Sequence, residues 1–142
     1  MKKVLFILVC VLVLFTICGC SSSDFIGTYT RETSWNHKIV CPEGTGTWLN
    51  SSSPEGVNTL VIENGGKGRF YFTANNGAYY GENFILYDGE ITWEVVDEYL
   101  YVEGTLYALD ESGESYELNR EFKLEGKTLV DAGTPEIRYN RK

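Results

Sequence analysis

The chain has 142 residues, a formal net charge of −8 and 43% hydrophobic residues, which suits one globular domain rather than two. The acidic balance argues against a nucleic-acid partner, because the phosphate backbone would repel it. Short alternating apolar runs recur without a period of 3.6 residues, so a mainly helical fold is disfavoured.

The first segment, residues 1–19, has the form of an export signal. Two lysines are followed by a run from Val4 to Ile17 that is almost entirely apolar. This run is shorter than the roughly 20 residues that a membrane-spanning helix needs. It ends in Ile17-Cys18-Gly19-Cys20, which resembles the bacterial lipobox: an aliphatic residue, a small residue at the cleavage site, and then cysteine.

This resemblance implies cleavage just before Cys20 and attachment of lipid to its thiol, which acts as the nucleophile. The lipid would hold the protein on a membrane, with residues 20–24 as a short tether. Because Ser21 follows the cysteine, the expected place is the outer membrane in a two-membrane cell. In a single-membrane cell it is the outer face of the plasma membrane. An uncleaved anchor and a plain secreted protein are the alternatives.

Loss of residues 1–19 would leave 123 residues and, without the two lysines, a net charge of −10. Cys10 and Cys18 would leave with the signal and Cys20 would carry lipid, so Cys41 has no partner for an intramolecular disulfide. Cys41 is either a small buried residue or a free thiol. We expect the mature protein to be a monomer.

Residues 25–142 are predicted to form one all-β domain. Runs rich in aromatic and β-branched residues alternate with turn-forming residues at about ten-residue spacing. Residues 42–57 are rich in glycine, serine and proline, and form either a long loop or a loop broken by a short strand around Trp48. The strands expected outside the central meander are Phe25–Thr33, Thr59–Glu63, Lys67–Ala74 and Glu136–Arg141.

The central meander can be aligned through four predicted turns. Asp88-Gly89 and Asp97-Glu98 are expected to make two-residue hairpins, residues 111–113 a three-residue loop, and Glu125-Gly126 a further turn. These turns keep one apolar face in register. The expected opposed pairs are Leu86 with Ile91, Phe84 with Trp93, Val95 with Leu100, Leu106 with Leu118, Val102 with Phe122, and Phe122 with Leu129.

Eight to ten strands in one small domain must hide their edges, and closing the meander into a barrel does so most completely. A two-sheet sandwich is the alternative.

Four segments, FIGTYT, ITWEVVDEYLYV, YELNREFKLEGKTLV and IRYNR, resemble the small lipocalin-like lipoproteins of bacteria. That family opens with a Gly-x-aromatic strand and closes on a strand bearing arginine. The chain departs from true lipocalins in having Tyr29 where their first strand has tryptophan, and in lacking their disulfide. The resemblance implies a barrel that binds a small apolar or amphipathic molecule at the cell envelope.

No catalytic pattern is present, and we expect neither an enzyme nor a cofactor. His37 is the only histidine, and no second histidine or cysteine pair completes a transition-metal site. No serine lies in a nucleophile-elbow glycine pattern.

Arg120 is predicted to point into the barrel, opposite Gly104 on one side and Asp131 on the other. It either pairs with Asp131, as an interior charge must, or meets the polar end of an amphipathic ligand. The candidate ligand-binding residues are Trp93, Arg120, Asp131, Tyr29 and Phe122.

Tyr99, Tyr101 and Tyr107 alternate with apolar residues and are expected to point outward. They either pack across strands on an exposed sheet or form a surface for an envelope protein. The second reading leads to a different function, an inhibitor or immunity-type interaction module whose barrel is filled by its own side chains.

Overall fold

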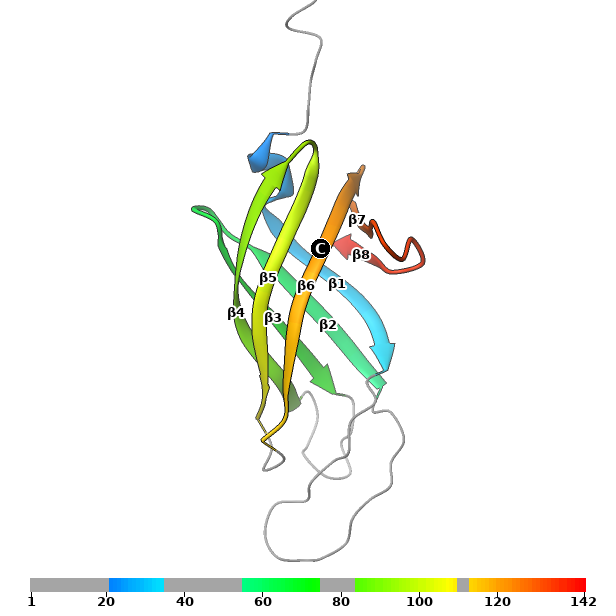
Figure 1. Cartoon of the computed structure of the whole chain (residues 1–142). Helices are drawn as coiled ribbons and strands as arrows, with labels where there is room; N and C mark the ends of the chain where they lie inside the picture. Colours follow the sequence, from blue (N-terminus) through cyan, green and yellow to red (C-terminus); the bar gives the residue numbers. More distant parts are fainter. Residues whose placement is uncertain (1–20, 35–54, 75–83, 110–112) are drawn as a thin grey trace, which may run out of the picture.

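The structure is a computed structural model that describes residues 21–34, 55–74, 84–109 and 113–142 (Figure 1). Eight antiparallel strands pair in sequence order, and the first also pairs with the last, so the sheet closes into a barrel. The predicted meander barrel is confirmed, and the sandwich is excluded. After a 3-10 helix, η1 (Ser22–Phe25), the strands are β1 (Gly27–Ser34), β2 (Glu55–Ile62), β3 (Lys67–Ala74), β4 (Phe84–Val96), β5 (Tyr99–Ala108), β6 (Ser115–Glu125), β7 (Thr128–Asp131) and β8 (Arg138–Arg141).

The predicted signal segment, Cys20, His37 and Cys41 lie outside the described residues. Among the residues that the structure does describe, no helix has the length and apolar composition needed to cross a bilayer.

The barrel is filled by side chains that alternate along each strand. In β3, Gly68, Phe70, Phe72 and Ala74 are buried while the residues between them are more exposed, the period of two expected of a strand with one face on the core. The hydrophobic core draws on every strand and on η1. All eight strands and this core lie between Phe25 and Arg141, so this part of the chain contains a complete barrel.

One end of the barrel is closed by η1, at the top of Figure 1. Phe25 at the end of η1 is fully buried, and its carbonyl accepts a hydrogen bond from the hydroxyl of Tyr29 at 2.9 Å. The guanidinium of Arg141 donates to the same hydroxyl and to the carbonyl of Asp24. The Gly-x-aromatic strand and the final arginine, which the sequence places at opposite ends of the domain, therefore meet.

The turn predicted at Asp97-Glu98 is confirmed. Both residues take positive φ angles, 48° and 70°, which a tight hairpin of this hand requires. Val95 lies opposite Leu100, as expected.

The hairpin predicted at Asp88-Gly89 is wrong, because β4 continues through both residues for 13 residues in all. A Cβ on Gly89 would lie 2.2 Å from the carbonyl oxygen of Thr105 in β5. Glycine is therefore needed here for the close approach of a neighbouring strand, not for a turn. The two pairings predicted from that turn, Leu86 with Ile91 and Phe84 with Trp93, are therefore also wrong. Ile91 opposes Gly104 instead, and Trp93 opposes Val102.

Two further registers differ from the prediction by two residues. Leu118 opposes Gly104 rather than Leu106, and Phe122 opposes Leu100 in β5 and Asp131 in β7. The turn predicted at Glu125-Gly126 lies one residue later, at Gly126 and Lys127, between the paired residues Glu125 and Thr128. Since side chains alternate with a period of two, a shift of two residues leaves each one on its predicted face.

Candidate functional site

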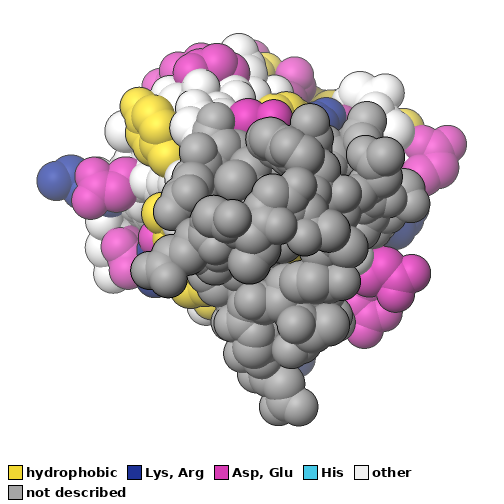
Figure 2. Space-filling view, turned by 90° about the horizontal axis from the view of Figure 1, so that it is seen from below, with side chains coloured by type: hydrophobic (Ala, Val, Ile, Leu, Met, Phe, Trp, Pro, Cys, Tyr) yellow, Lys and Arg dark blue, Asp and Glu magenta, His cyan; other side chains and the backbone are white. Residues whose placement is uncertain are grey.

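A cavity of about 430 Å³ lies in the half of the barrel opposite η1, where β1 ends and β6 begins. Figure 2 views the molecule from this end and shows acidic side chains at several places around the periphery. The volume lies within the range of about 300–1,000 Å³ that small-molecule sites occupy. The described residues that line the cavity are Arg31, Thr33, Ser34, Asn58, Phe70, Tyr87, Glu114, Ser115, Tyr116, Leu118, Arg120, Phe122, Ile137 and Tyr139.

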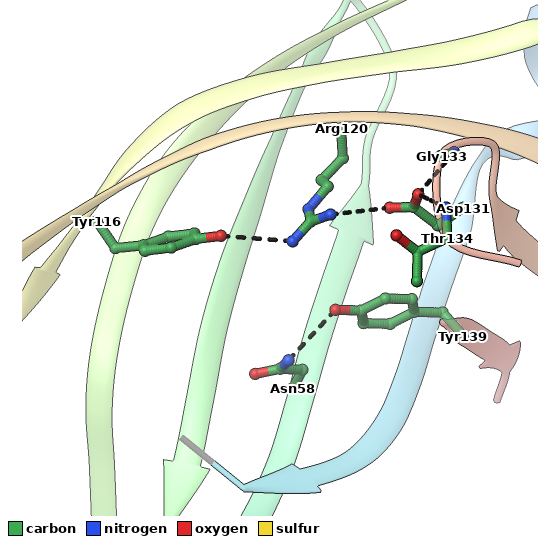
Figure 3. A network of polar contacts seen from close by, with 7 residues as sticks. All are labelled: Asn58, Tyr116, Arg120, Asp131, Gly133, Thr134 and Tyr139. Carbon is green, nitrogen blue, oxygen red and sulfur yellow. Dashed lines mark hydrogen bonds and ion pairs between the residues drawn. The ribbon is translucent and has the colours of Figure 1, made fainter. Parts of the chain in front are cut away.

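Arg120 projects from β6 toward Asp131 at the end of β7 (Figure 3). Its Nη1 lies 3.3 Å from Oδ2 of Asp131, and its Nη2 lies 3.4 Å from the hydroxyl of Tyr116. The Asp131 side chain is 4% exposed, whereas that of Arg120 is 34% exposed although it faces the barrel interior. The guanidinium is therefore only partly buried, and it belongs to a residue that lines the cavity.

The other oxygen of Asp131 holds the loop that connects β7 and β8. Its Oδ1 accepts hydrogen bonds from the backbone amides of Gly133 at 2.9 Å and Thr134 at 2.8 Å. Asp131 thus shapes this turn as well as facing Arg120. The ion pair that the sequence suggested between Arg120 and Asp131 is present, reached diagonally because Asp131 opposes Phe122.

A second group of polar side chains surrounds the hydroxyl of Tyr139 in β8. Nδ2 of Asn58 donates to it at 3.2 Å (Figure 3). Arg31 lies close enough for its positive charge to act on the pKa of this hydroxyl. The strand register explains this proximity: Tyr29 pairs with Arg141 in the antiparallel ladder, so the residues two positions further in, Arg31 and Tyr139, lie at one level on adjacent strands.

The electrostatics of these groups reflect partial burial. Burial raises the pKa of Tyr139, against the lowering effect of the Asn58 hydrogen bond and of the Arg31 and Arg120 charges. Burial acts to lower the pKa of Arg120, but the hydrogen bond and charge of Tyr116, with the nearby Asp131, leave it raised. At neutral pH the cavity therefore holds a neutral phenol and a charged guanidinium.

The rest of the wall is apolar. The ring of Tyr139 packs edge-on against Phe122, with ring centres 5.7 Å apart, and against Phe70, at 6.3 Å. Leu118 and Ile137 complete this surface. The cavity therefore combines an apolar wall with a few converging polar groups, as small-molecule sites do.

The five candidate ligand-binding residues are not brought to one place. Arg120 and Phe122 line the cavity, and Asp131 reaches it through its contact with Arg120. Tyr29 lies at the closed end instead. The indole N–H of Trp93 faces the β2–β3 turn and is shared between the carbonyls of Glu63 and Lys67, so this residue fastens a hairpin.

The outward orientation of the three tyrosines is confirmed. Tyr107 is 58% exposed, while Tyr99 and Tyr101 are half-buried on the outer face of β5. Tyr101 lies opposite Glu121 of β6, which helps to raise its pKa, and this is the packing across strands expected of an exposed sheet. Contact with a partner stays a prediction.

A larger hollow of about 1170 Å³ lies on the outside of the barrel, over β3 to β6. Its charged groups engage one another: Arg69 forms two hydrogen bonds of 2.7 Å with Asp88, and Thr105 donates to Glu117 at 3.0 Å. The guanidinium of Arg69 lowers the pKa of Asp88. Because these groups are exposed and mutually satisfied, the interior cavity is the better candidate site.

Within the described parts of the chain, no three His, Cys, Asp or Glu side chains gather closely enough to hold a metal ion.

Arg31, Asn58, Tyr116 and Tyr139 were missed by the sequence reasoning. Strand alternation was the available signal for two of them, because Arg31 lies two residues after Tyr29 and Tyr139 two before Arg141. Asn58 lies just before the predicted start of its strand, since β2 begins four residues earlier, at Glu55, and Tyr116 lies near the start of β6, which the sequence did not delimit.

Comparisons with protein-family models, with curated proteins and with solved structures find no match to this chain. Inferences about its function therefore rest on the residues of the barrel itself.

Proposed function

We propose that this protein is a lipid-anchored, extracytoplasmic barrel that holds a small amphipathic molecule in the half of the barrel opposite η1. The observation that carries the proposal is the exposure of Arg120: it faces inward, yet a third of its side chain remains accessible through the cavity. A barrel filled by its own side chains would bury or pair this guanidinium completely. Around it, Phe70, Phe122 and Leu118 supply apolar contact for the remainder of a ligand.

The membrane anchor in this proposal is supported by the lipobox-like Ile17-Cys18-Gly19-Cys20. Intact-mass measurement of the full chain extracted from bacterial membranes tests it. The expected species begins at Cys20 and carries the added mass of a diacylglyceryl group. Cys20→Ser should abolish this species, and a wild-type chain that keeps residues 1–19 without lipid would refute the anchor.

Binding is tested by filling the cavity. Leu118 is buried, lines the cavity and lies two residues from Arg120 on β6, so Leu118→Trp adds bulk inside the site. Fluorescence titration with the neutral apolar probe N-phenyl-1-naphthylamine should show saturable binding to the wild type and at least tenfold weaker binding to Leu118→Trp.

The matched control is Tyr107→Trp, which adds an indole on the exposed outer face and should leave probe binding unchanged. Far-UV circular dichroism and a cooperative thermal transition establish that each variant folds. Equal probe binding by wild type and Leu118→Trp would place the probe elsewhere and contradict the proposed site.

A further inference from the structure

The polar end of the cavity carries a surplus of positive charge although the protein as a whole is acidic. Arg31 and Arg120 both line it. Within the part of the chain that the structure describes, Arg31 forms no ion pair with a carboxylate. Asp131, which pairs with Arg120, already accepts two backbone amides through its other oxygen.

Both guanidinium groups retain unused donors. Each arginine has five N–H groups in a planar fork. Among the described residues, Arg120 engages two of them at long distances, 3.3 and 3.4 Å, and the charge of Arg31 lies near the Tyr139 hydroxyl. Tyr139 feels both charges, since Arg31 and Arg120 each act to lower its pKa. Both guanidinium groups therefore belong to residues that line the same cavity as Tyr139, and both lie near its neutral hydroxyl, which can also donate.

The other carboxylate that lines the cavity is remote from this region. Glu114 is exposed at the rim, where it accepts a hydrogen bond from the hydroxyl of Tyr87 at 2.9 Å. It precedes Arg120 by six residues along an extended chain, which corresponds to about 20 Å of strand. Glu114 therefore lies at the rim, while Arg31 and Arg120 lie near Tyr139.

We propose that the ligand of this cavity is an anionic amphiphile whose oxyanion head, a carboxylate or a phosphate, is held between Arg31 and Arg120. This inference rests on the proposed ligand-binding function and specifies its ligand class. The Tyr139 hydroxyl adds a donor beside the guanidinium forks, and the apolar tail lies against Phe70, Phe122 and Leu118. Hydrogen bonds to charged groups contribute about twice as much as neutral ones, so the head group decides selectivity.

The test compares four single-chain probes of equal length below their micelle concentrations: dodecanoate, dodecyl phosphate, dodecanol and dodecylammonium. Calorimetric titration of the barrel, residues 21–142, should give at least tenfold tighter binding of an anionic probe than of dodecanol. The stronger of dodecanoate and dodecyl phosphate identifies the head group. Dodecylammonium should bind most weakly.

The variant that isolates the head-group contact is Arg31→Met, because it leaves the Arg120–Asp131 pair in place. It should weaken binding of the anionic probe about tenfold and leave dodecanol binding unchanged. Arg120→Met combined with Asp131→Asn removes the second guanidinium without stranding a buried carboxylate, and should act in the same way. The control is Arg138→Met, an exposed arginine of β8 that does not line the cavity.

The two proposals fail in different ways. Equal wild-type affinity for dodecanoate, dodecyl phosphate and dodecanol, or a preference for dodecylammonium, would overturn the anion assignment and leave the ligand-binding function standing. Absence of binding for all four probes by a folded barrel would overturn the ligand-binding function and the anion assignment together.

Discussion

The guanidinium of Arg141 lies over the ring of Tyr29, 5.1 Å from its centre, and its Nε donates to the Tyr29 hydroxyl at 3.2 Å. Only two backbone pairs join β1 to β8, Tyr29 with Arg141 and Thr30 with Asn140. The side-chain contact therefore reinforces the narrowest seam of the barrel. It also ties the seam to η1, because the same hydroxyl donates to the carbonyl of Phe25.

Tyr29→Phe should cost about 1–3 kcal/mol of unfolding free energy, because Arg141 and the Phe25 carbonyl both lose a buried hydrogen-bond partner. Urea unfolding measures the loss. Arg138→Met on the same strand is the control, and as an exposed substitution it should stay within about 0.5 kcal/mol of the wild type. A Tyr29→Phe protein as stable as the wild type would show that the seam does not depend on this hydroxyl.

The buried phenol of Tyr139 should make the fold sensitive to alkali. Burial raises the pKa of Tyr139 above its unfolded value of about 10, so the neutral form is favoured in the folded state. Its contribution to stability is fully present below pH 10 and is lost as the pH rises through the folded pKa. The midpoint temperature of thermal unfolding should therefore fall less steeply between pH 8 and 12 for Tyr139→Phe than for the wild type. Tyr107→Phe, an exposed phenol, should leave the slope unchanged, and parallel slopes for all three proteins would contradict this assignment.

Gly89→Ala distinguishes a strand glycine from a turn glycine. The new Cβ would lie 2.2 Å from the carbonyl oxygen of Thr105. Overpacking costs roughly 1–3 kcal/mol of unfolding free energy, and we expect Gly89→Ala to cost about 3 kcal/mol or more. Gly113→Ala is the comparison: Gly113 has a φ of 67° and open space around its Cα, so only the left-handed backbone is penalised, by about 1 kcal/mol. Denaturant unfolding measures both. A smaller loss at Gly89 than at Gly113 would contradict the continuous strand.

Asp131 has two roles that two substitutions can separate. Asp131→Asn removes the charge facing Arg120 but keeps an oxygen for the amides of Gly133 and Thr134. Asp131→Ala removes both, and should cost about 1–3 kcal/mol more because two amides lose their acceptor. Chemical denaturation of the two variants measures the difference in their unfolding free energies. Equal losses would mean that the amide contacts contribute nothing to stability.

The sequence predicted the barrel well because strand alternation and closure depend on patterns that are local or general. The Asp97-Glu98 turn is flanked by apolar residues that pair directly across it, so neighbouring residues alone decide its register. Asp88-Gly89 has the same local pattern but another cause, since the carbonyl of Thr105, 16 residues away in sequence, requires the glycine. A rule that considers only neighbouring residues does not predict contacts between segments that are distant in sequence.

The candidate site was predicted only in part for the same reason. Arg120 and Asp131 were paired correctly because a two-residue register error preserves the face of each side chain. The proximity of Arg31 and Tyr139 depends on β1 meeting β8, which happens only when the barrel closes. Trp93 and Tyr29 were assigned to the ligand because they are inward-facing aromatics, but alternation does not say at which end of the barrel an inward residue lies.

The central claim, that the half of the barrel opposite η1 holds a small amphipathic molecule, is tested most directly by mass spectrometry of an organic extract of the purified barrel. The protein should be expressed from Ser21 onward in a bacterial host and, if empty, incubated with total bacterial lipid before re-purification. We predict one class of amphiphile at near-stoichiometric amount in the wild type and none in Leu118→Trp. A clean extract from well-folded wild-type protein, even after this incubation, would contradict the account.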